Sequence, residues 1–215
     1  MIDTAMAQSC TVAAGSTVTL TMGICTIASG TTLTGTPAIH ASNDTTQITT
    51  NNVTINPNNG GSIGGLADTL GSIIFSSGSG INGNWSTAAS AQSGGTIVFQ
   101  SGSAINPAFG GGGTAPLADG SGSGINASGL AVSLNGAGNN VAAKAANGGL
   151  IAMQNSSITY AAGGGGNTGL WATGAGSKAS ATDTTIFDAR RRRQRRWRAR
   201  GHRWGGYADR RHRHC

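Results

Sequence analysis

Two internal repeats constrain the fold of this chain more than any other feature. SIIFSSGSGI at 72–81 and TIVFQSGSAI at 96–105 carry Ile, Phe, Gly and Ile at matching places, so that Ile73 corresponds to Ile97. A related unit reads GGLIAMQNSSI at 148–158 and returns as AGSKASATDTTI at 175–186. Each unit consists of a Gly-rich turn, a short alternating run, an Asn, Asp, Ser or Gly turn and a short Ile-bearing strand. The fold must therefore be one that can repeat this unit.

Residue alternation within the units predicts strands that share one core. Ile97 and Phe99 fall on one face of a strand and Val98 on the other. The same style, with Thr alternating with Val, Leu or Ile, occurs at 16–27 and 49–55. A single unit has too little apolar surface to fold alone, whereas stacked units can share a core. We predict an all-β parallel solenoid of about seven or eight rungs. A sandwich or barrel is the alternative, although no two-residue hairpin signals pair adjacent strands.

Composition supports strands over helices and separates the chain into two parts by charge. Gly makes up 37 of the 215 residues, Glu is absent and Lys occurs twice, so few residues favour helix. Residues 1–187 carry two Lys against five Asp, whereas residues 188–215 carry twelve Arg against two Asp. The net charge of +7 therefore reflects the tail alone and indicates nothing about what the body binds.

Two stretches resemble the passenger domains of bacterial autotransporters of the pertactin-like, type V secretion kind. They are GLWATGAGSKASATDTTIF at 169–187 and NGGLIAMQNSSIT at 147–159, and the likeness in style covers most of 10–187. The resemblance implies a right-handed parallel β-helix that is exported and displayed outside the cell by a carboxy-terminal outer-membrane β-barrel. No series of about ten-residue alternating strands closes this sequence. We therefore expect a fragment of such a protein, at the cell surface, in the outer membrane or extracellular.

The amino terminus carries a pattern that signal peptidases cut. Ala5 and Ala7 flank Met6 in a small-x-small arrangement, but neither a basic nor an apolar region precedes them. We interpret residues 1–9 as the remnant of a signal peptide or a disordered leader, and residues 10–187 as the β-helix domain. Chance is the competing interpretation, because Ala is common in this chain.

The basic tail has two competing interpretations. RRRRQRRWRAR at 190–200 could be an RNA-binding arm, in which Arg pairs with phosphates and Trp197 stacks on bases. It could also result from a frameshift, since Gly and Ala codons of a high-GC gene become Arg codons one base out of phase. Synonymous codons chosen for 188–215 can be read one base later as a continuation of the repeat. We favour the frameshift, do not expect nucleic acid as a partner, and expect a disordered tail and an uncapped rung near Phe187.

Few residues of the body suggest chemistry. Cys10 and Cys25 enclose a loop short enough for a disulfide between neighbouring rungs, which an exported protein would form; two buried thiols are the alternative. Cys215 lies in the tail. His40 is the only His before the tail, so we expect it on a surface loop and predict no Ser-His-Asp site. The glycine run at 109–116 lacks the spacing of a phosphate loop and predicts a corner.

The function we predict is a non-enzymatic structural stalk or adhesin whose surface ligand the repeats do not reveal. We assign no catalytic, cofactor or metal site. A carbohydrate-active β-helix enzyme is the alternative, and it would need paired carboxylates about 5–9.5 Å apart. The candidate carboxylates are spread over different units, and none recurs at a spacing that would stack them; a pair on adjacent rungs is the alternative, but the sequence selects none. These carboxylates are Asp44, Asp68, Asp119 and Asp183. Asp183 aligns with Asn155 of the preceding unit, which predicts a turn.

Overall fold

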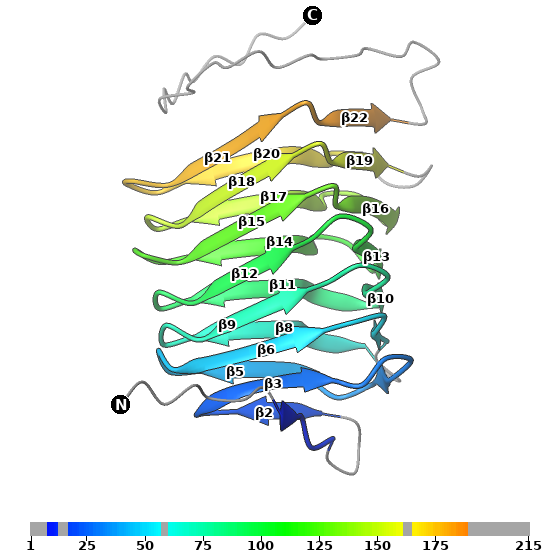
Figure 1. The fold of residues 1–215 in the computed structure, drawn as a ribbon. Coiled ribbons are helices and arrows are strands. Elements are labelled where there is room, and N and C mark those ends of the chain that lie inside the picture. The colour runs from blue at the N-terminus through cyan, green and yellow to red at the C-terminus, as the bar shows by residue number, and fades with distance from the viewer. Residues whose placement is uncertain (1–7, 13–16, 57–59, 161–164, 189–215) are drawn as a thin grey trace, which may run out of the picture.

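A computed structural model describes residues 8–12, 17–56, 60–160 and 165–188 of the chain (Figure 1). All elements in these ranges are strands, and none is a helix. The described residues accordingly contain no helix with the length and apolarity to cross a membrane. Ala5 and Ala7, most of the predicted leader and all but the first residue of the predicted tail lie outside the described residues.

The strands form three sheets, which we call A, B and C. Sheet A consists of β1 (Gln8–Ser9), β3 (Gly23–Ile27), β6 (Thr46–Thr50), β9 (Ser72–Phe75), β12 (Thr96–Phe99), β15 (Gly124–Ser128), β18 (Leu150–Gln154) and β21 (Lys178–Thr182). Sheet B consists of β2 (Val18–Leu20), β5 (Ile39–Ser42), β8 (Gly61–Asp68), β11 (Trp85–Gln92), β14 (Thr114–Asp119), β17 (Val141–Ala146) and β20 (Thr168–Thr173). Sheet C consists of β4 (Thr32–Leu33), β7 (Thr54–Ile55), β10 (Gly80–Gly83), β13 (Ala104–Phe109), β16 (Ala131–Gly136), β19 (Ser157–Tyr160) and β22 (Thr185–Asp188).

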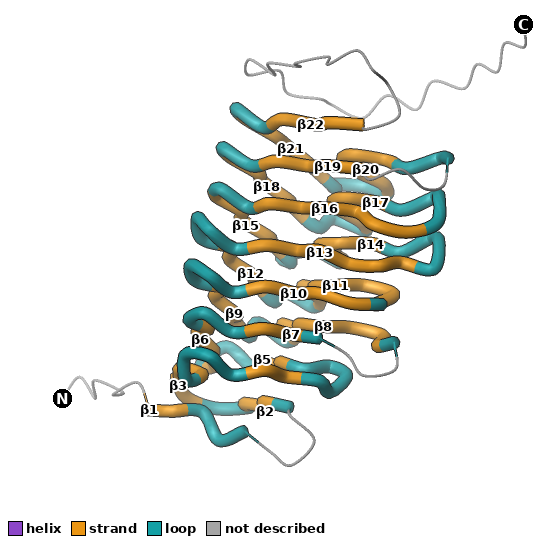
Figure 2. Tube along the Cα trace, turned by 90° about the vertical axis from the view of Figure 1, so that its right-hand side faces the viewer, coloured by secondary structure: helices purple, strands orange, loops and turns teal. Residues whose placement is uncertain are grey.

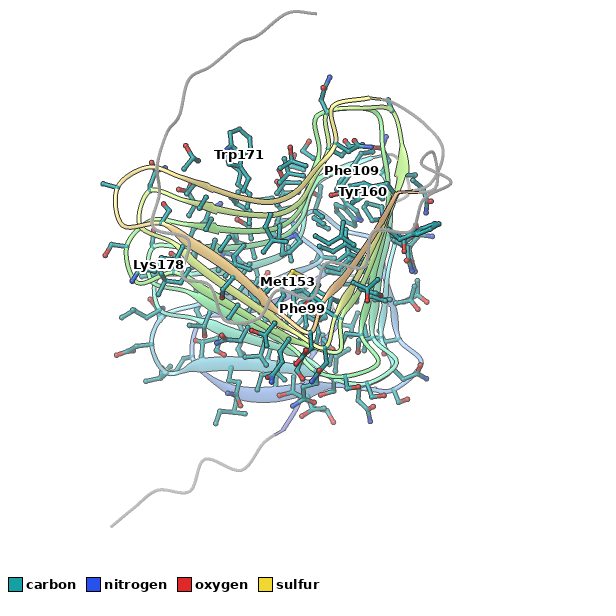
Figure 3. The ribbon with its side chains drawn as sticks, turned by 90° about the horizontal axis from the view of Figure 1, so that it is seen from above. Phe99, Phe109, Met153, Tyr160, Trp171 and Lys178 are labelled. Carbon is teal, nitrogen blue, oxygen red and sulfur yellow. A yellow bond between two sulfur atoms is a disulfide. The ribbon has the colours of Figure 1, made fainter. Side chains whose placement is uncertain are left out.

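The chain visits sheets B, A and C in turn and then begins the next turn above (Figure 2). Every strand pair is parallel, for example β9 with β12 and β12 with β15. Seven strands stacked in one sheet correspond to about six full turns of the coil. Seen from the end that carries β22, the chain runs anticlockwise as it rises toward the viewer (Figure 3), so the coil is right-handed. The fold is thus the predicted all-β parallel solenoid, and the sandwich alternative is wrong.

The repeats align as their spacing predicts. Ile73 pairs with Ile97 and Phe75 with Phe99 in sheet A, while Ile81 pairs with Ile105 in sheet C. Because one strand position always faces inward, each such pair extends into a column of buried side chains along the axis. One such column, in sheet C, consists of Leu33, Ile55, Ile81, Ile105, Val132, Ile158 and Ile186. These columns are the shared core that no single unit could form.

Corner residues repeat in the same way. Asn155 and Asp183 both have positive φ, 49° and 48°, and occupy the same corner in successive turns, which confirms the turn predicted for Asp183. Buried hydroxyls satisfy corner carbonyls: Ser123 Oγ donates to the Asp119 carbonyl at 2.7 Å, and Ser103 Oγ donates to the Phe75 carbonyl at 2.9 Å. The glycine run at 109–116 contains the corner between β13 and β14, as predicted.

Candidate functional site

The outer face of sheet B carries four of the described ionisable side chains: His40, Asp68, Asp119 and Lys144. Two neighbouring outward columns run along this face. One consists of Thr19, His40, Leu66, Ser90, Leu117, Lys144 and Trp171. The other consists of Ser42, Asp68, Gln92, Asp119, Ala146 and Thr173. Successive side chains of a strand point to opposite faces, so the small Ala side chains of these strands point inward and both columns point outward. The strand register therefore places His40, Asp68, Asp119 and Lys144 on one face of the sheet.

His40 lies within β5, so the prediction that it occupies a surface loop is wrong. Its Nε2 is 3.2 Å from Asp68 Oδ2 on the neighbouring turn, and each side chain is 26% exposed. Neither His40 Nε2 nor Asp68 Oδ1 makes a hydrogen bond to the described residues. This contact is an imidazole–carboxylate pair in which His40 is charged only when protonated.

Two hydroxyls lie in register beside the His40–Asp68 pair, Thr19 beside His40 and Ser42 beside Asp68, but His40 Nε2 makes no hydrogen bond to either. Ser90 shares the column of His40 but lies two strands away, about 10 Å at ~4.8 Å per strand. Activation of a hydroxyl by histidine needs hydrogen-bond contact. Ser90 Oγ instead accepts a hydrogen bond from Gln92 Nε2 at 2.9 Å. The arrangement of His40, Asp68 and Ser90 is therefore not that of a catalytic triad.

Asp68 and Asp119 lie in one column, which corrects the expectation that no Asp residues stack. Gln92 occupies the strand between them, so their strands are about 9.6 Å apart. This separation is close to the upper limit for an acid–base pair of inverting glycosidases, ~9.5 Å. Asp119 Oδ1 accepts a hydrogen bond from Asn147 Nδ2 at 2.7 Å. Asp44 and Asp183 lie away from this column, at corners of the coil.

Trp171 extends the same face at the upper end of sheet B. Its side chain points outward from β20 (Figure 3) and is 45% exposed. Lys144 Nζ lies 4.7 Å from the centroid of the Trp171 ring, within the range of a cation–π contact. One part of this ring is thereby held by the neighbouring turn, while the remainder faces solvent.

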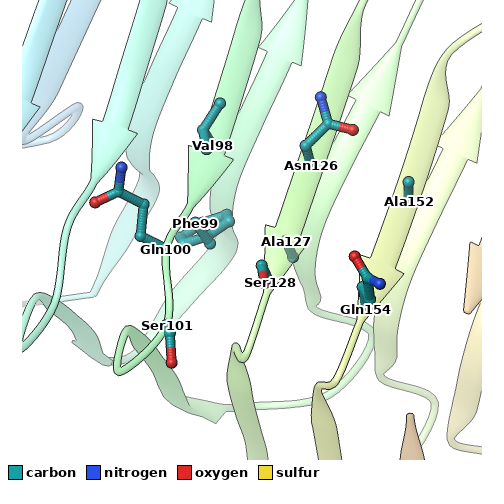
Figure 4. Close-up of a pocket in the computed structure, with 9 residues that line it drawn as sticks. All are labelled: Val98, Phe99, Gln100, Ser101, Asn126, Ala127, Ser128, Ala152 and Gln154. Atoms are coloured by element: carbon teal, nitrogen blue, oxygen red, sulfur yellow. The ribbon is translucent and has the colours of Figure 1, made fainter. Parts of the chain in front are cut away.

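Sheet A has a depression of about 330 Å³ on its outer face (Figure 4). Its polar lining includes Gln100, Asn126, Ser128 and Gln154, and all nine lining residues are uncharged. Ser128 pairs with Gln154 on β18, and Gln100 precedes it by one turn. The depression exists because the short Ser128 side chain separates two long glutamine side chains. Among the described residues, none of these four polar side chains makes a hydrogen bond, in contrast to Asn106 on sheet C, whose Nδ2 donates to Asn82 Oδ1 at 3.2 Å.

The two predicted disulfide residues are joined in the structure. Cys10 and Cys25 form a disulfide with Cα atoms 5.0 Å apart and a sequence separation of 15. It links the chain just after β1 to the neighbouring β3, and Cys25 is buried in the inner column of sheet A. Cys215, predicted to have no role, lies outside the described residues.

The described residues contain no cluster of three or more His, Cys, Asp or Glu side chains arranged to hold a metal ion. Comparison of the chain with protein families, with curated proteins and with solved structures finds no match. The resemblance to autotransporter passengers, which the sequence suggested, therefore stays a prediction.

Proposed function

We propose that this protein is a structural, adhesin-like β-helix stalk. The observation that supports the proposal is the unbroken parallel register of all three sheets, from β2 to β22. Each turn is hydrogen-bonded to the next and shares its apolar columns, so the described solenoid is a stiff rod that holds its outer face at fixed positions. A rod of this kind displays side chains rather than enclosing a reaction site.

We further propose that the stalk is the passenger fragment of an autotransporter and acts outside the cell. The two stretches that carry the resemblance, 147–159 and 169–187, supply strands of the last described turns of the right-handed coil. The Cys10–Cys25 disulfide supports an extracytoplasmic location, because disulfides persist in oxidising compartments.

The gene itself provides the test of this proposal. We expect DNA downstream of codon 188, read in another frame, to continue the repeat and to end in a membrane β-barrel. The reconstituted full-length protein should then be digested by protease added to intact cells, and those cells should adhere to a surface that cells without the gene do not hold. If no other frame stays open past codon 188, the autotransporter assignment is overturned. If the displayed rod supports no adhesion, the adhesive role is overturned separately.

A carbohydrate-active enzyme is the second candidate, and the shared column of Asp68 and Asp119 is the observation that favours it. In an inverting hydrolysis one carboxyl would protonate the leaving oxygen while the other removes a proton from the attacking water. We would incubate the purified chain with a panel of polysaccharides and measure new reducing ends. Activity that is lost in both Asp68→Asn and Asp119→Asn would support the enzyme over the stalk, whereas an inactive chain would exclude hydrolysis of the polysaccharides tested.

A further inference from the structure

We propose that the depression on sheet A binds an uncharged glycan. The inference rests on the proposed adhesive role and gives it a ligand class. The first observation is the availability of the lining: Gln100, Ser128 and Gln154 offer amide and hydroxyl groups that no described residue engages. A carboxamide both donates and accepts hydrogen bonds, as does a serine hydroxyl, and a sugar hydroxyl needs such a partner. All three side chains are exposed to solvent and so can reach a ligand without unfolding.

The spacing of the polar groups suits a chain with regularly placed hydroxyls. Gln100, directly after β12, lies in register with Ser128 at the end of β15 and Gln154 at the end of β18, on three successive turns. The backbone positions of the two glutamines are therefore about 9–10 Å apart, with the short serine between them. A ligand seated above Ser128 would lie within reach of both glutamines, and the volume of the depression, about 330 Å³, is at the small end of typical ligand sites, ~300–1,000 Å³.

The apolar part of the lining also matches a sugar. Val98 and Ala152 lie in the outward column beside the glutamines, with Asn126 between them. They provide methyl groups against which the C–H faces of a pyranose ring can pack, while Asn126 adds a further amide. The lining thus combines polar and apolar groups, as a sugar ring does.

Charge and backbone pairing exclude two other ligand classes. The lining has no ionisable side chain, so an acidic or basic ligand would find no counter-charge there. An extended peptide that adds a strand needs a free sheet edge, but β12, β15 and β18 are each paired on both sides. Hydroxyl groups on a neutral ligand are the chemistry that remains.

The test uses the intact 215-residue chain and defined probes: cellohexaose, maltohexaose, xylohexaose and mannohexaose. Saturation-transfer NMR and calorimetric titration would measure binding. We expect at least one probe to bind in the millimolar to high-micromolar range. Ser128→Phe, which fills the space between the glutamines, should weaken that binding at least tenfold. Gln154→Ala should weaken it about two- to tenfold, since it removes one or two hydrogen bonds.

Two control variants locate the effect. Asn106→Ala removes an exposed amide from sheet C and should leave affinity unchanged. Trp171→Ala removes the exposed aromatic ring of sheet B and should also leave it unchanged. Circular dichroism and the melting temperature would verify that each variant is folded.

Two results would overturn the inference. The first is that none of the four probes binds at about 10 mM, near the weakest affinity that such contacts would give. The second is that binding survives in Ser128→Phe but is lost in Trp171→Ala, which would place the site on sheet B. Either failure is distinguishable from failure of the proposed function, because cells displaying the rod could still adhere through another face.

Discussion

Replacing Phe99 with Ala is expected to destabilise the solenoid by about 4–5 kcal/mol. Phe99 and Phe75 are each 1% exposed, and their rings stack with centroids 4.8 Å apart and planes 9° from parallel. Buried Phe→Ala substitutions cost about 3–5 kcal/mol, of which ring stacking contributes ~0.5–1.5 kcal/mol. The next residue in this column is Ala127, whose small side chain cannot fill the space that the ring leaves. The cost should therefore fall in the upper half of the range.

Guanidinium unfolding followed by circular dichroism would measure this loss. Phe99→Leu, which keeps most of the volume, should cost less than about 1.5 kcal/mol. Val98→Ala, on the outer face of the same strand, should cost less than about 1 kcal/mol because Val98 is only half-buried. A loss below about 2 kcal/mol for Phe99→Ala, or one equal to that of Val98→Ala, would refute the argument that stacked columns stabilise the coil.

Three further predictions concern the corners and the first turn. Gly95→Ala would place a Cβ 2.2 Å from a backbone oxygen of the preceding turn and should cost about 1–3 kcal/mol in denaturant unfolding. Gly124→Ala meets nothing within 4 Å and should be neutral or slightly stabilising; equal effects of the two would contradict the clash. Replacing Cys10 and Cys25 by Ser should lower stability by about 3 kcal/mol, as expected for a loop of about 15 residues, and an unchanged melting temperature would argue against the bridge. Asp183→Val should destabilise and Asp183→Gly should not, because φ is 48° there; melting temperatures in the opposite order would contradict this account.

The Cys10–Cys25 disulfide was predicted and the stacking of Asp68 and Asp119 was not, because only the stacking depends on the register between distant strands. The Cys10–Cys25 pair is close in sequence, so its proximity needed no knowledge of the coil. The stacking of Asp68 and Asp119 spans two turns of unequal length, since Gln92 is nearer in sequence to Asp68 than to Asp119. The extra residues of the longer turn lie in corners, where insertions are tolerated. A constant spacing applied to the sequence therefore places these carboxylates in different columns, which is why their stacking was not expected.

The depression on sheet A was missed for the same reason. The turn from Gln100 to Ser128 is longer than the turn from Ser128 to Gln154, and each of the three is an ordinary polar residue in its own unit. The sequence would have suggested a shared position for them only if the corner lengths had been known. His40 illustrates the related error of assigning a lone polar residue to a loop, since an outward strand position accommodates it equally well.

By itself the sequence determined the class of fold, because residue alternation, Gly-rich corners and near-identical units are local properties that only a stacked coil can satisfy together. It also determined which residues form the core columns wherever successive units have the same length, as at Ile73 and Ile97. Only the tertiary structure decided which outward side chains became neighbours. Neighbours along the axis depend on the length of every corner between them, and corner length is set by packing and turn geometry rather than by the strand pattern.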